Sequence, residues 1–324
     1  MRVAIVGCGY VGLELARDLA ERGHEVTGVR RSTAGLDAVE AVVGDGNGDA
    51  DGTGTVDGDG NGNADGTGTV EAVRADATDP ASLSALPDAD AVVFAASSGG
   101  RGAAAARAVY VEGLGNVVEE YGDRAVPPER LVYTSSTGVY GDHGGDWVDE
   151  ETPIEPTTEK TRVLAEAERV ALEGASDVGI DGTVARFAGL YGPDRYRLER
   201  YLEGPVTAGF LNMVHRDDAA GAIRYLLEAD LARGEPVVVV DDEPVDKHAF
   251  ADWLADECGV DRPEKRSKAE RIAAGDLSTA AERRIRTSKR CSNDRLRSFG
   301  YEFAYPTFRE GYRDAIDGVR RSRG

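Results

Sequence analysis

Three glycines near the N-terminus have the spacing of a turn that could hold a diphosphate group. Gly7, Gly9 and Gly12 lie between a short apolar run and a segment with helical periodicity. The first glycine permits a tight turn, the second lets the backbone approach a pyrophosphate, and the third lets a helix pack closely on a strand. Free amides at the start of the helix favour negative charge. The pattern predicts binding of a nicotinamide dinucleotide, the alternative being a glycine-rich turn without a ligand. The expected contacts are Gly7, Gly9, Tyr10, Val11 and Gly12.

Two adjacent arginines follow the second expected strand, where the ribose of a dinucleotide would lie. A protein that binds NAD usually carries an acidic residue there. Here Arg30 and Arg31 occupy the place, and no carboxylate comes before Asp37. Guanidinium groups form charge-assisted bonds with a 2′-phosphate, so NADP(H) is preferred to NAD(H), and a pair of solvated arginines is the alternative. Contacts with the adenine and pyrophosphate are expected from residues after the third and fourth strands, namely Asp76, Ala95, Ala96 and Ser97.

Several segments combine in a pattern that resembles one enzyme superfamily. They are GCGYVGLELA, YTSSTGVYG, RFAGLYGPDR and VHRDDAAGAI. The chain resembles the extended short-chain dehydrogenase/reductases, in the NAD-dependent epimerase/dehydratase group, and within it the atypical branch of YeeZ-like proteins. The resemblance implies that Ser136 bonds the reacting hydroxyl or carbonyl of a substrate, since a hydroxyl both donates and accepts; a strand-end cap is the alternative. It also implies that residues 215–218 shape the substrate side, with Asp217 or Asp218 serving as a helix cap.

The chain departs from this family at the usual acid/base. The family uses a Tyr in the pattern Y-x-x-x-K, but here Thr158 stands at the Tyr and Arg162 at the Lys. A threonine hydroxyl is far too weak an acid to relay a proton near neutral pH, although Arg162 could still bond the ribose. Lys160 is two residues out of register and is expected to face away. Other side chains could supply the acid, although packing or solvation is the alternative for each: Tyr110, Tyr140 and His143.

Short apolar runs alternate with helical patterns through the first two thirds of the chain, as is typical of βαβ units. Strands are expected at residues 2–6, 25–29, 72–75, 91–95, 130–134, 183–187 and 236–240, and helices at 11–22, 101–121 and 159–173. Right-handed crossovers place helices on both faces, so the predicted fold is α/β, a doubly wound parallel Rossmann sheet. We expect a dinucleotide-binding domain over residues 1–240. A smaller, mostly helical substrate lobe follows over residues 241–324, with substrate-side segments also from residues 186–223.

Residues 44–70 interrupt this rhythm with a tandem duplication. The copies GDGNGDADGTGTV and GDGNGNADGTGTV are separated by Asp57 and contain almost no apolar side chains. Such a segment cannot bury enough surface to offset the entropy of ordering, so a disordered low-complexity insert is expected. Calcium binding is the alternative because Asn47, Asp49 and Asp51 have the spacing of a calcium loop, although Gly58 stands where that loop needs a Glu.

The charge balance excludes several classes of partner. Of 324 residues, 38 are basic and 59 acidic, which gives a net charge of −21, and five of the basic residues are lysines. Such a surface repels phosphate backbones and anionic lipid, so neither nucleic acid nor membrane is expected as a partner. An acidic, arginine-rich surface is typical of a protein from a salt-rich, halophilic cytoplasm. The three cysteines lack a C-x-x-C pair and no targeting segment is recognised, so a cytoplasmic protein without a metal site is expected.

The leading hypothesis is an NAD(P)-dependent oxidoreductase or epimerase-type enzyme that acts on a hydroxylated small molecule, with a nucleotide sugar as one candidate. The cofactor would carry the hydride and Ser136 would polarise the substrate oxygen, while a group other than the usual Tyr relays the proton. The alternative is a catalytically silent NADP(H)-binding sensor or interaction module, which the presence of Thr158 favours. The resemblance further implies a homodimer.

Overall fold

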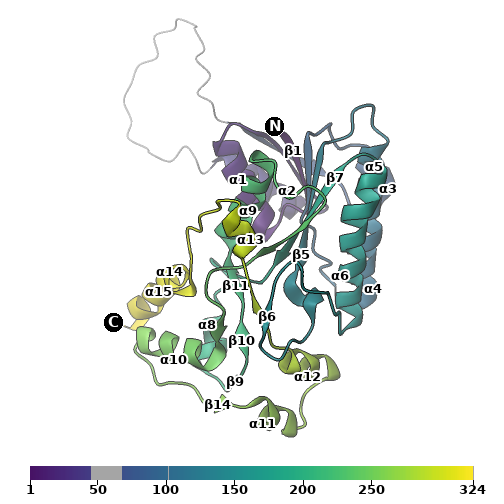
Figure 1. Ribbon diagram of the computed structural model, residues 1–324. Helices are drawn as coiled ribbons and strands as arrows, with labels where there is room; N and C mark the ends of the chain where they lie inside the picture. The colour runs from purple at the N-terminus through teal and green to yellow at the C-terminus, as the bar shows by residue number, and fades with distance from the viewer. Residues whose placement is uncertain (45–67, 101, 324) are drawn as a thin grey trace, which may run out of the picture.

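A parallel sheet of seven strands forms the centre of the molecule (Figure 1). The computed structural model describes residues 1–44, 68–100 and 102–323. The strands follow the order β12-β7-β5-β4-β1-β2-β3, and every neighbouring pair is parallel. Their bounds are β1 Arg2–Val6, β2 Glu25–Arg30, β3 Thr69–Arg74, β4 Ala91–Phe94, β5 Arg130–Ser136, β7 Asp181–Phe187 and β12 Pro236–Val239. The doubly wound α/β fold expected from the sequence is confirmed.

Helices cover both faces of the sheet because its strands are apolar on both sides. In β1, Val3 and Ile5 pack in one apolar cluster while Ala4 and Val6 pack in the other, as successive side chains of a strand must. One layer contains α1 (Tyr10–Glu21), α2 (Thr33–Gly44), α9 (Arg216–Glu228) and α13 (Asp294–Ser298). The opposite layer contains α3 (Pro80–Leu83), α4 (Ala103–Arg107), η1 (Ala108–Gly113), α5 (Leu114–Gly122), α6 (Glu159–Arg169), η3 (Val170–Gly174) and α7 (Ala175–Asp177).

The third strand begins earlier than the sequence suggests. Thr69 and Val70 were expected in the disordered insert, but they pair with Glu25 and Val26 of β2. This correction has a simple cause, since a Thr-Val pair suits a strand and the edge of β2 offers it a hydrogen-bonding ladder. Gly44 ends α2 and Gly68 precedes β3, so both ends of the insert are placed. The rest of the insert, with both candidate calcium segments, lies outside the described residues.

A further apolar cluster, rich in aromatic rings, lies outside the sheet. Phe250 packs against Phe308 and Tyr312 with ring centroids 5.2 Å apart in both cases, and Tyr191 stacks on Tyr312 at 4.9 Å. The elements that contribute to it are β8 (Gly189–Tyr191), α8 (Leu198–Leu202), β9 (Val206–Thr207), β10 (Phe210–Leu211), β11 (Met213–His215), β13 (Val245–Asp246), α10 (Lys247–Cys258), α14 (Phe308–Gly311) and α15 (Arg313–Arg323). Next to it, β14 (Lys265–Arg266) pairs with β9, and α11 (Lys268–Ala273) and α12 (Thr279–Arg286) follow in the chain. Two short segments after β5, η2 (Thr137–Tyr140) and β6 (Trp147–Val148), lead toward β15 (Arg290–Cys291), which pairs with β6.

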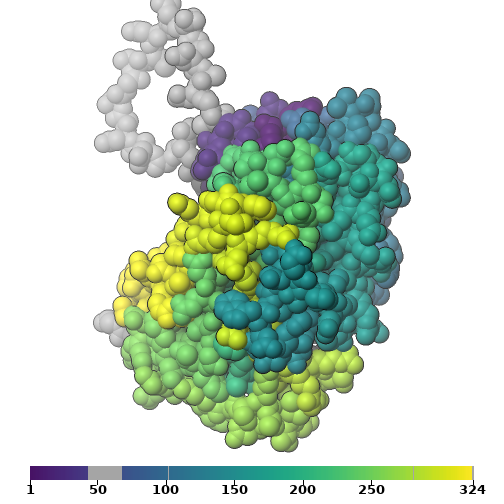
Figure 2. All heavy atoms as spheres, in the orientation of Figure 1, coloured from purple at the N-terminus to yellow at the C-terminus, as the bar shows by residue number. Residues whose placement is uncertain are grey.

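The chain returns to the sheet before it ends. Leu296, Tyr301 and Phe303 belong to the same apolar cluster as β1, α1 and α9. Figure 2 shows the C-terminal part of the chain, in yellow, packed against the green and purple surface of the sheet layer. A division at residue 240 into two domains therefore stays a prediction, because the last third contributes side chains to both cores.

Candidate functional site

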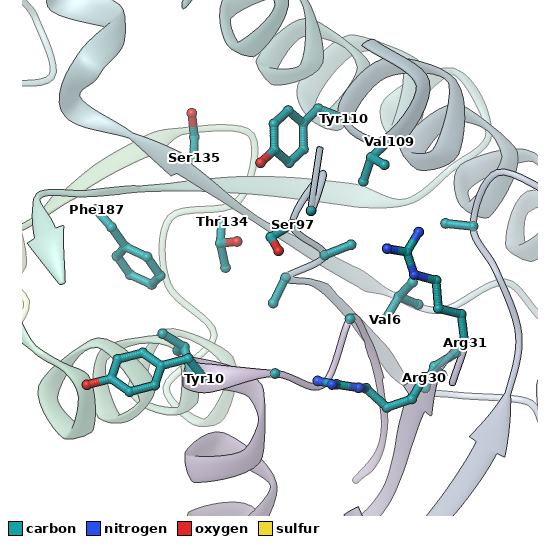
Figure 3. A pocket seen from close by; sticks show the side chains of 18 of the residues that line it. Val6, Tyr10, Arg30, Arg31, Ser97, Val109, Tyr110, Thr134, Ser135 and Phe187 are labelled. Carbon is teal, nitrogen blue, oxygen red and sulfur yellow. The ribbon is translucent and has the colours of Figure 1, made fainter. Parts of the chain in front are cut away.

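A cavity of about 580 Å³ opens at the carboxyl ends of the central strands (Figure 3). Its lining includes the last residues of β1, β2, β5 and β7, which are Val6, Arg30, Ser136 and Phe187. Ligands of open parallel sheets bind at this edge, where the strand order reverses, which here is between β1 and β4. The residues that the sequence assigns to a cofactor and that line the cavity are Gly7, Gly9, Tyr10, Val11, Arg30, Arg31, Asp76, Ala95, Ala96 and Ser97.

The glycine turn has the geometry of a cradle. Gly7 has a φ of +87°, and a Cβ on it would lie 2.2 Å from the Cα of Ala96, so only glycine fits. Gly12 does not line the cavity. It faces β1 instead, where a Cβ on it would lie 3.1 Å from a methyl group of Ile5. No side chain caps the start of α1 at Gly9, and no acidic residue lies in its first turn. The free amides of this helix end therefore fit a diphosphate.

The two arginines approach the cavity differently. Arg30 donates from Nη1 to the carbonyl of Cys8 at 2.7 Å, so its guanidinium lies against the glycine turn. Arg31 reaches across toward the loop after β4, where its Nη2 lies 3.1 Å from the point that a Cβ on Gly99 would occupy. Figure 3 shows the two guanidinium groups pointing in different directions. Neither forms an ion pair within the part of the chain that the structure describes, so both can face an anion.

The loops after β3 and β4 close one side of the cavity. Asp76 accepts hydrogen bonds from the backbone N–H and the hydroxyl of Thr78, at 3.0 and 2.9 Å. The backbone N–H of Thr78 lowers the pKa of this carboxyl most, so it stays ionised. The N–H of Ala95 donates to the carbonyl of Val6 at 2.8 Å, which holds the start of the loop after β4 against the end of β1.

Three consecutive hydroxyls at the end of β5 line the cavity, and their hydrogen bonds distinguish them. Thr134 donates to the carbonyl of Phe94 at 3.3 Å, and Ser135 donates to Oε1 of Glu168 at 2.6 Å. Figure 3 shows these two side chains on opposite sides of the strand. Ser136 instead accepts the N–H of Gly138 at 3.1 Å. Its own proton is therefore the one still available to a substrate oxygen, although the same bond makes it the N-cap of η2.

A buried polar network lies behind these hydroxyls. Glu168 binds Arg186 through Nε at 3.1 Å and Nη2 at 2.7 Å, and Arg186 donates from Nη1 to the hydroxyl of Tyr140 at 2.8 Å. Tyr140 is fully buried and does not line the cavity, and burial raises its pKa. A catalytic role for Tyr140 stays a prediction, since its hydroxyl is already engaged in this network.

The start of α6 corrects one expectation about Lys160. Thr158 caps this helix in a reciprocal pair with Thr161, accepting the Thr161 N–H at 3.1 Å, so its hydroxyl is used structurally. Neither Thr158 nor Arg162 lines the cavity, and their catalytic roles stay predictions. Lys160 does line it, so the expectation that it faces away is wrong. The helix begins only at Glu159, and its first turn packs beside the Ser136 loop, where Lys160 reaches the opening.

Of the other two candidate acids, Tyr110 lines the cavity and His143 does not. Tyr110 lines the cavity and accepts the N–H of Ser98 at 3.3 Å. It lies in η1, a π-helical segment that interrupts the single helix expected over residues 101–121, and such segments are frequent at functional sites. His143 bonds the carbonyl of Tyr140 through Nε2 at 2.8 Å and is not part of the cavity lining.

None of residues 215–218 lines the cavity, and two of them instead hold α9 and the C-terminal segment in place. His215, and not Asp217 or Asp218 as expected, caps α9 by accepting the Asp217 N–H at 3.3 Å. Asp218 is buried and accepts the N–H groups of Ala304 and Tyr305 at 2.8 and 2.9 Å. The carboxylate therefore fastens the C-terminal segment to the start of α9.

Sequence reasoning missed Arg195 as a site residue. Its guanidinium carbon lies 4.0 Å from the centre of the Tyr10 ring, and the Tyr10 hydroxyl donates to the carbonyl of Pro193 at 2.9 Å. Both side chains line the cavity. The quoted segment RFAGLYGPDR ends at this arginine, but its spacing gave no reason to bring it back to the glycine turn.

Neither a cluster of metal ligands nor a membrane-spanning helix is found in the described residues. In residues 1–44, 68–100 and 102–323, no group of three or more His, Cys, Asp or Glu side chains could hold a metal ion. Over the same described ranges, no helix combines the length and apolar character that a bilayer span requires.

Comparisons with known proteins agree with this geometry. A model of the NAD dependent epimerase/dehydratase family matches residues 3–226. "Protein YeeZ" of Escherichia coli strain K12 is 29% identical over 308 residues, which cover 94% of this chain and 96% of YeeZ. The solved structure of a protein from Methylobacillus flagellatus is 28% identical with a TM-score of 0.70, covering 99% of this chain and 98% of that one. The dTDP-glucose 4,6-dehydratase DesIV of Streptomyces venezuelae, solved with NAD and TYD bound, has a TM-score of 0.72 at 20% identity, covering 100% and 98%.

Proposed function

The chain belongs to the NAD-dependent epimerase/dehydratase family, and from this premise we propose that it is an NADP(H)-dependent oxidoreductase or epimerase-type enzyme acting on a hydroxylated small molecule. The family resemblance stated from the sequence is thereby confirmed. One observation supports the proposal most strongly: the glycine turn and the hydroxyl of Ser136 line the same cavity. A diphosphate cradle and an available proton donor thus share one space.

The cofactor end of the cavity is assigned to the turn and the two arginines. When bound, a nicotinamide dinucleotide supplies the hydride acceptor or donor that these side chains lack. The amides that begin α1 would hold its diphosphate, and Arg31, which forms no ion pair among the described residues, would bind a 2′-phosphate. Asp76, ionised on the adenine side, would accept hydrogen bonds there.

The substrate end is assigned to Ser136. Because its oxygen accepts the Gly138 N–H, its proton can point to the oxygen of a hydroxyl or carbonyl. Tyr110 is the phenol we assign to proton relay, since its oxygen accepts the Ser98 N–H and its own proton remains available to the cavity. A nucleotide sugar is the substrate class we favour, in line with DesIV, which is named a dTDP-glucose 4,6-dehydratase. We further propose that the protein works as a homodimer in a salt-rich cytoplasm.

A catalytically silent NADP(H)-binding module is the second candidate. It is favoured by Thr158, which stands at the position of the family's acid/base and whose hydroxyl is committed to capping α6. Such a module would bind the dinucleotide without turning over any substrate.

The test is a search for turnover followed by removal of one hydroxyl. Purified protein is incubated with NADP+ or NADPH and a panel of nucleotide sugars, sugars and ketones, and the dinucleotide absorbance is followed. We expect Ser136→Ala to lower kcat by about 10²–10³-fold, as the loss of one preorganised donor does. Thr134→Val removes a hydroxyl from the same cavity whose proton is already bonded to Phe94, so a loss below tenfold is expected. Turnover that Ser136→Ala leaves unchanged would contradict the assignment, and no turnover with any compound would favour the silent module.

A further inference from the structure

Most lysines of this acidic chain form no ion pair with the described residues. Lys265 forms an ion pair with Asp252 at 2.5 Å. The other four, Lys160, Lys247, Lys268 and Lys289, have no carboxylate within ion-pair distance in the described part of the chain. In a protein with a net charge of −21 most exposed cations would be expected to find an acidic partner. Lysines that lack one are therefore candidates for binding an external anion.

Two of these lysines converge on one glycine, outside the cavity described above. The Nζ of Lys247 lies 3.4 Å, and the Cε of Lys268 lies 3.6 Å, from the point that a Cβ on Gly209 would occupy. Both side chains are half-buried. Lys268 donates to the carbonyl of Arg286 at 2.9 Å and keeps two further protons, whereas no hydrogen bond from Lys247 Nζ is found among the described residues. The space above Gly209 is thus flanked by two ammonium side chains.

A buried hydroxyl points to the same space. Ser288 is only 6% exposed, and its Oγ lies 3.8 Å from the same Cβ point on Gly209. Its backbone is fully engaged, but no hydrogen bond of the hydroxyl itself is found in the described ranges. A hydroxyl on so buried a residue usually has a partner, so this one is placed to donate to a ligand. We call Lys247, Lys268 and Ser288 the Gly209 cluster.

The charges that face the cluster do not neutralise it. Asp246 is adjacent in sequence, but one of its oxygens accepts the N–H groups of His248 and Ala249 at 2.9 and 3.1 Å and so caps α10. Burial lowers the pKa of Lys247 most, the positive charges of Arg200 and Lys268 lower it further, and the charge of Asp246 raises it in part. The neighbouring cations repel one another, and a bound anion would relieve that repulsion.

The backbone connects this cluster to the loop at residues 142–145. The N–H of Ser288 donates to Asp142 at 2.7 Å, and its carbonyl accepts the N–H groups of His143 and Gly145, both at 3.0 Å. This loop follows η2, which begins directly after Ser136. Figure 1 shows β10, which contains Phe210, in the same lower part of the molecule as α11 and α12. The cluster therefore adjoins the loop that follows Ser136, the residue that we assign to the substrate.

We propose that Lys247, Lys268 and Ser288 form an oxyanion-binding site around Gly209 that holds a phosphate or carboxylate group of the substrate. Two ammonium groups and a hydroxyl donor suit a compact oxyanion. The assignment of that anion to a substrate rests on the proposed function. The existence of the site does not, because a free inorganic anion can occupy it.

The test is calorimetric titration of inorganic phosphate into the full-length protein at an ionic strength held constant with KCl. We expect Lys247→Gln and Lys268→Gln each to raise the phosphate Kd by tenfold or more, and Ser288→Ala to raise it severalfold. Lys265→Gln is the matched control, since this lysine is already paired with Asp252, and its Kd should stay within twofold of the wild type. Phosphate bound at the glycine turn would have the same Kd in every variant. Differences in Kd between the variants therefore report on the Gly209 cluster.

A second arm identifies the source of the anion. If the site serves the substrate, saturating phosphate raises KM in the wild type but not in Lys247→Gln, while kcat is unchanged. Phosphate binding that depends on Lys247 in a protein without turnover supports the site and contradicts the proposed function. Equal phosphate affinity in all lysine variants, or none in the wild type, overturns the site even if the enzyme is active.

Discussion

Burial decides the charge of one histidine at the start of α9. His215 is 2% exposed, and the N–H of Asp217 donates to its Nδ1. Burial lowers the pKa of His215 to about 4, the charge of Asp217 opposes this shift, and Arg216 and Asp314 act in smaller, opposite senses. Because the ring must accept a hydrogen bond to cap the helix, the neutral form is the one that the fold requires.

This histidine should make the protein less stable in acid. Unfolded, it takes up a proton near pH 6.5, but folded only near pH 4, so between these values the unfolded state binds more protons. Stability is therefore fully present above pH 6.5 and falls as the pH drops toward 4. Each unit of pKa shift is worth about 1.4 kcal/mol, so the total effect is about 3 kcal/mol. His215→Asn keeps an acceptor for the Asp217 N–H and does not titrate. When urea unfolding is measured from pH 7 to pH 4, the free energy of unfolding should fall more in the wild type than in the variant. Equal falls in both proteins would contradict this account.

At the scale of residues, the sequence predicted what depends on local spacing. Gly7, Gly9 and Arg30 follow one another within a single strand-turn-helix-strand unit, so their meeting in one cavity could be expected. Lys160 and Arg195 reach the same cavity through long irregular segments whose paths no local pattern encodes. The hydrogen bond that distinguishes Ser136 from Ser135 likewise depends on Glu168, which lies on another element.

At the scale of elements, long apolar runs were predictable and short pairings were not. All seven strands of the sheet were expected, and the central ones, such as β1 and β4, are apolar runs buried on both faces, whereas the edge strand β3 is partly exposed. Two-residue strands such as β6 and β15 carry no such pattern, since Trp147 and Arg290 become partners only through the tertiary fold. The π-helical η1 was missed for the same reason, as its composition is that of an ordinary helix.

The attachment of the C-terminal segment to α9 should depend on one carboxylate. Asp218 accepts the N–H groups of Ala304 and Tyr305, and the hydroxyl of Tyr301 donates to it at 3.3 Å. Asp218→Ala would leave buried donors without acceptors, so the free energy of unfolding should fall by about 2–4 kcal/mol. Asp217→Ala, on the same helical turn but bonded to the side chain of Arg216, is the matched control with a smaller loss. Equal losses in urea unfolding would show that Asp218 is not the anchor.

The whole molecule carries a large negative charge. With 59 acidic against 38 basic residues, the net charge is −21, and the carboxylates repel one another across the folded surface. Salt shortens the range of that repulsion, from about 10 Å at 0.1 M to about 3 Å at 1 M. Closely paired ions such as Arg186 and Glu168 are buried and are screened far less. We therefore expect concentrated salt to favour the folded state.

Stability should accordingly rise with salt. We expect the Tm to increase by several degrees when KCl is raised from about 0.1 M to about 2 M, because screening relieves the repulsion of the net charge. Sorbitol at matched osmolality is the control, since it changes water activity without screening charge. A Tm that is flat in KCl, or that rises equally in sorbitol, would remove the electrostatic explanation.

The central claim is that the cavity at the carboxyl edge of the sheet binds a pyridine dinucleotide, and direct titration tests it best. NADPH and NADH are added to the protein in concentrated KCl, and nicotinamide fluorescence reports binding. Arg31→Ala is the informative variant, because Arg30 also bonds the Cys8 carbonyl and its loss would disturb the glycine turn itself. We predict that the wild type binds NADPH at least tenfold more tightly than NADH, and that Arg31→Ala removes this preference while leaving NADH affinity nearly unchanged. A folded protein with no measurable affinity for either dinucleotide would contradict the account.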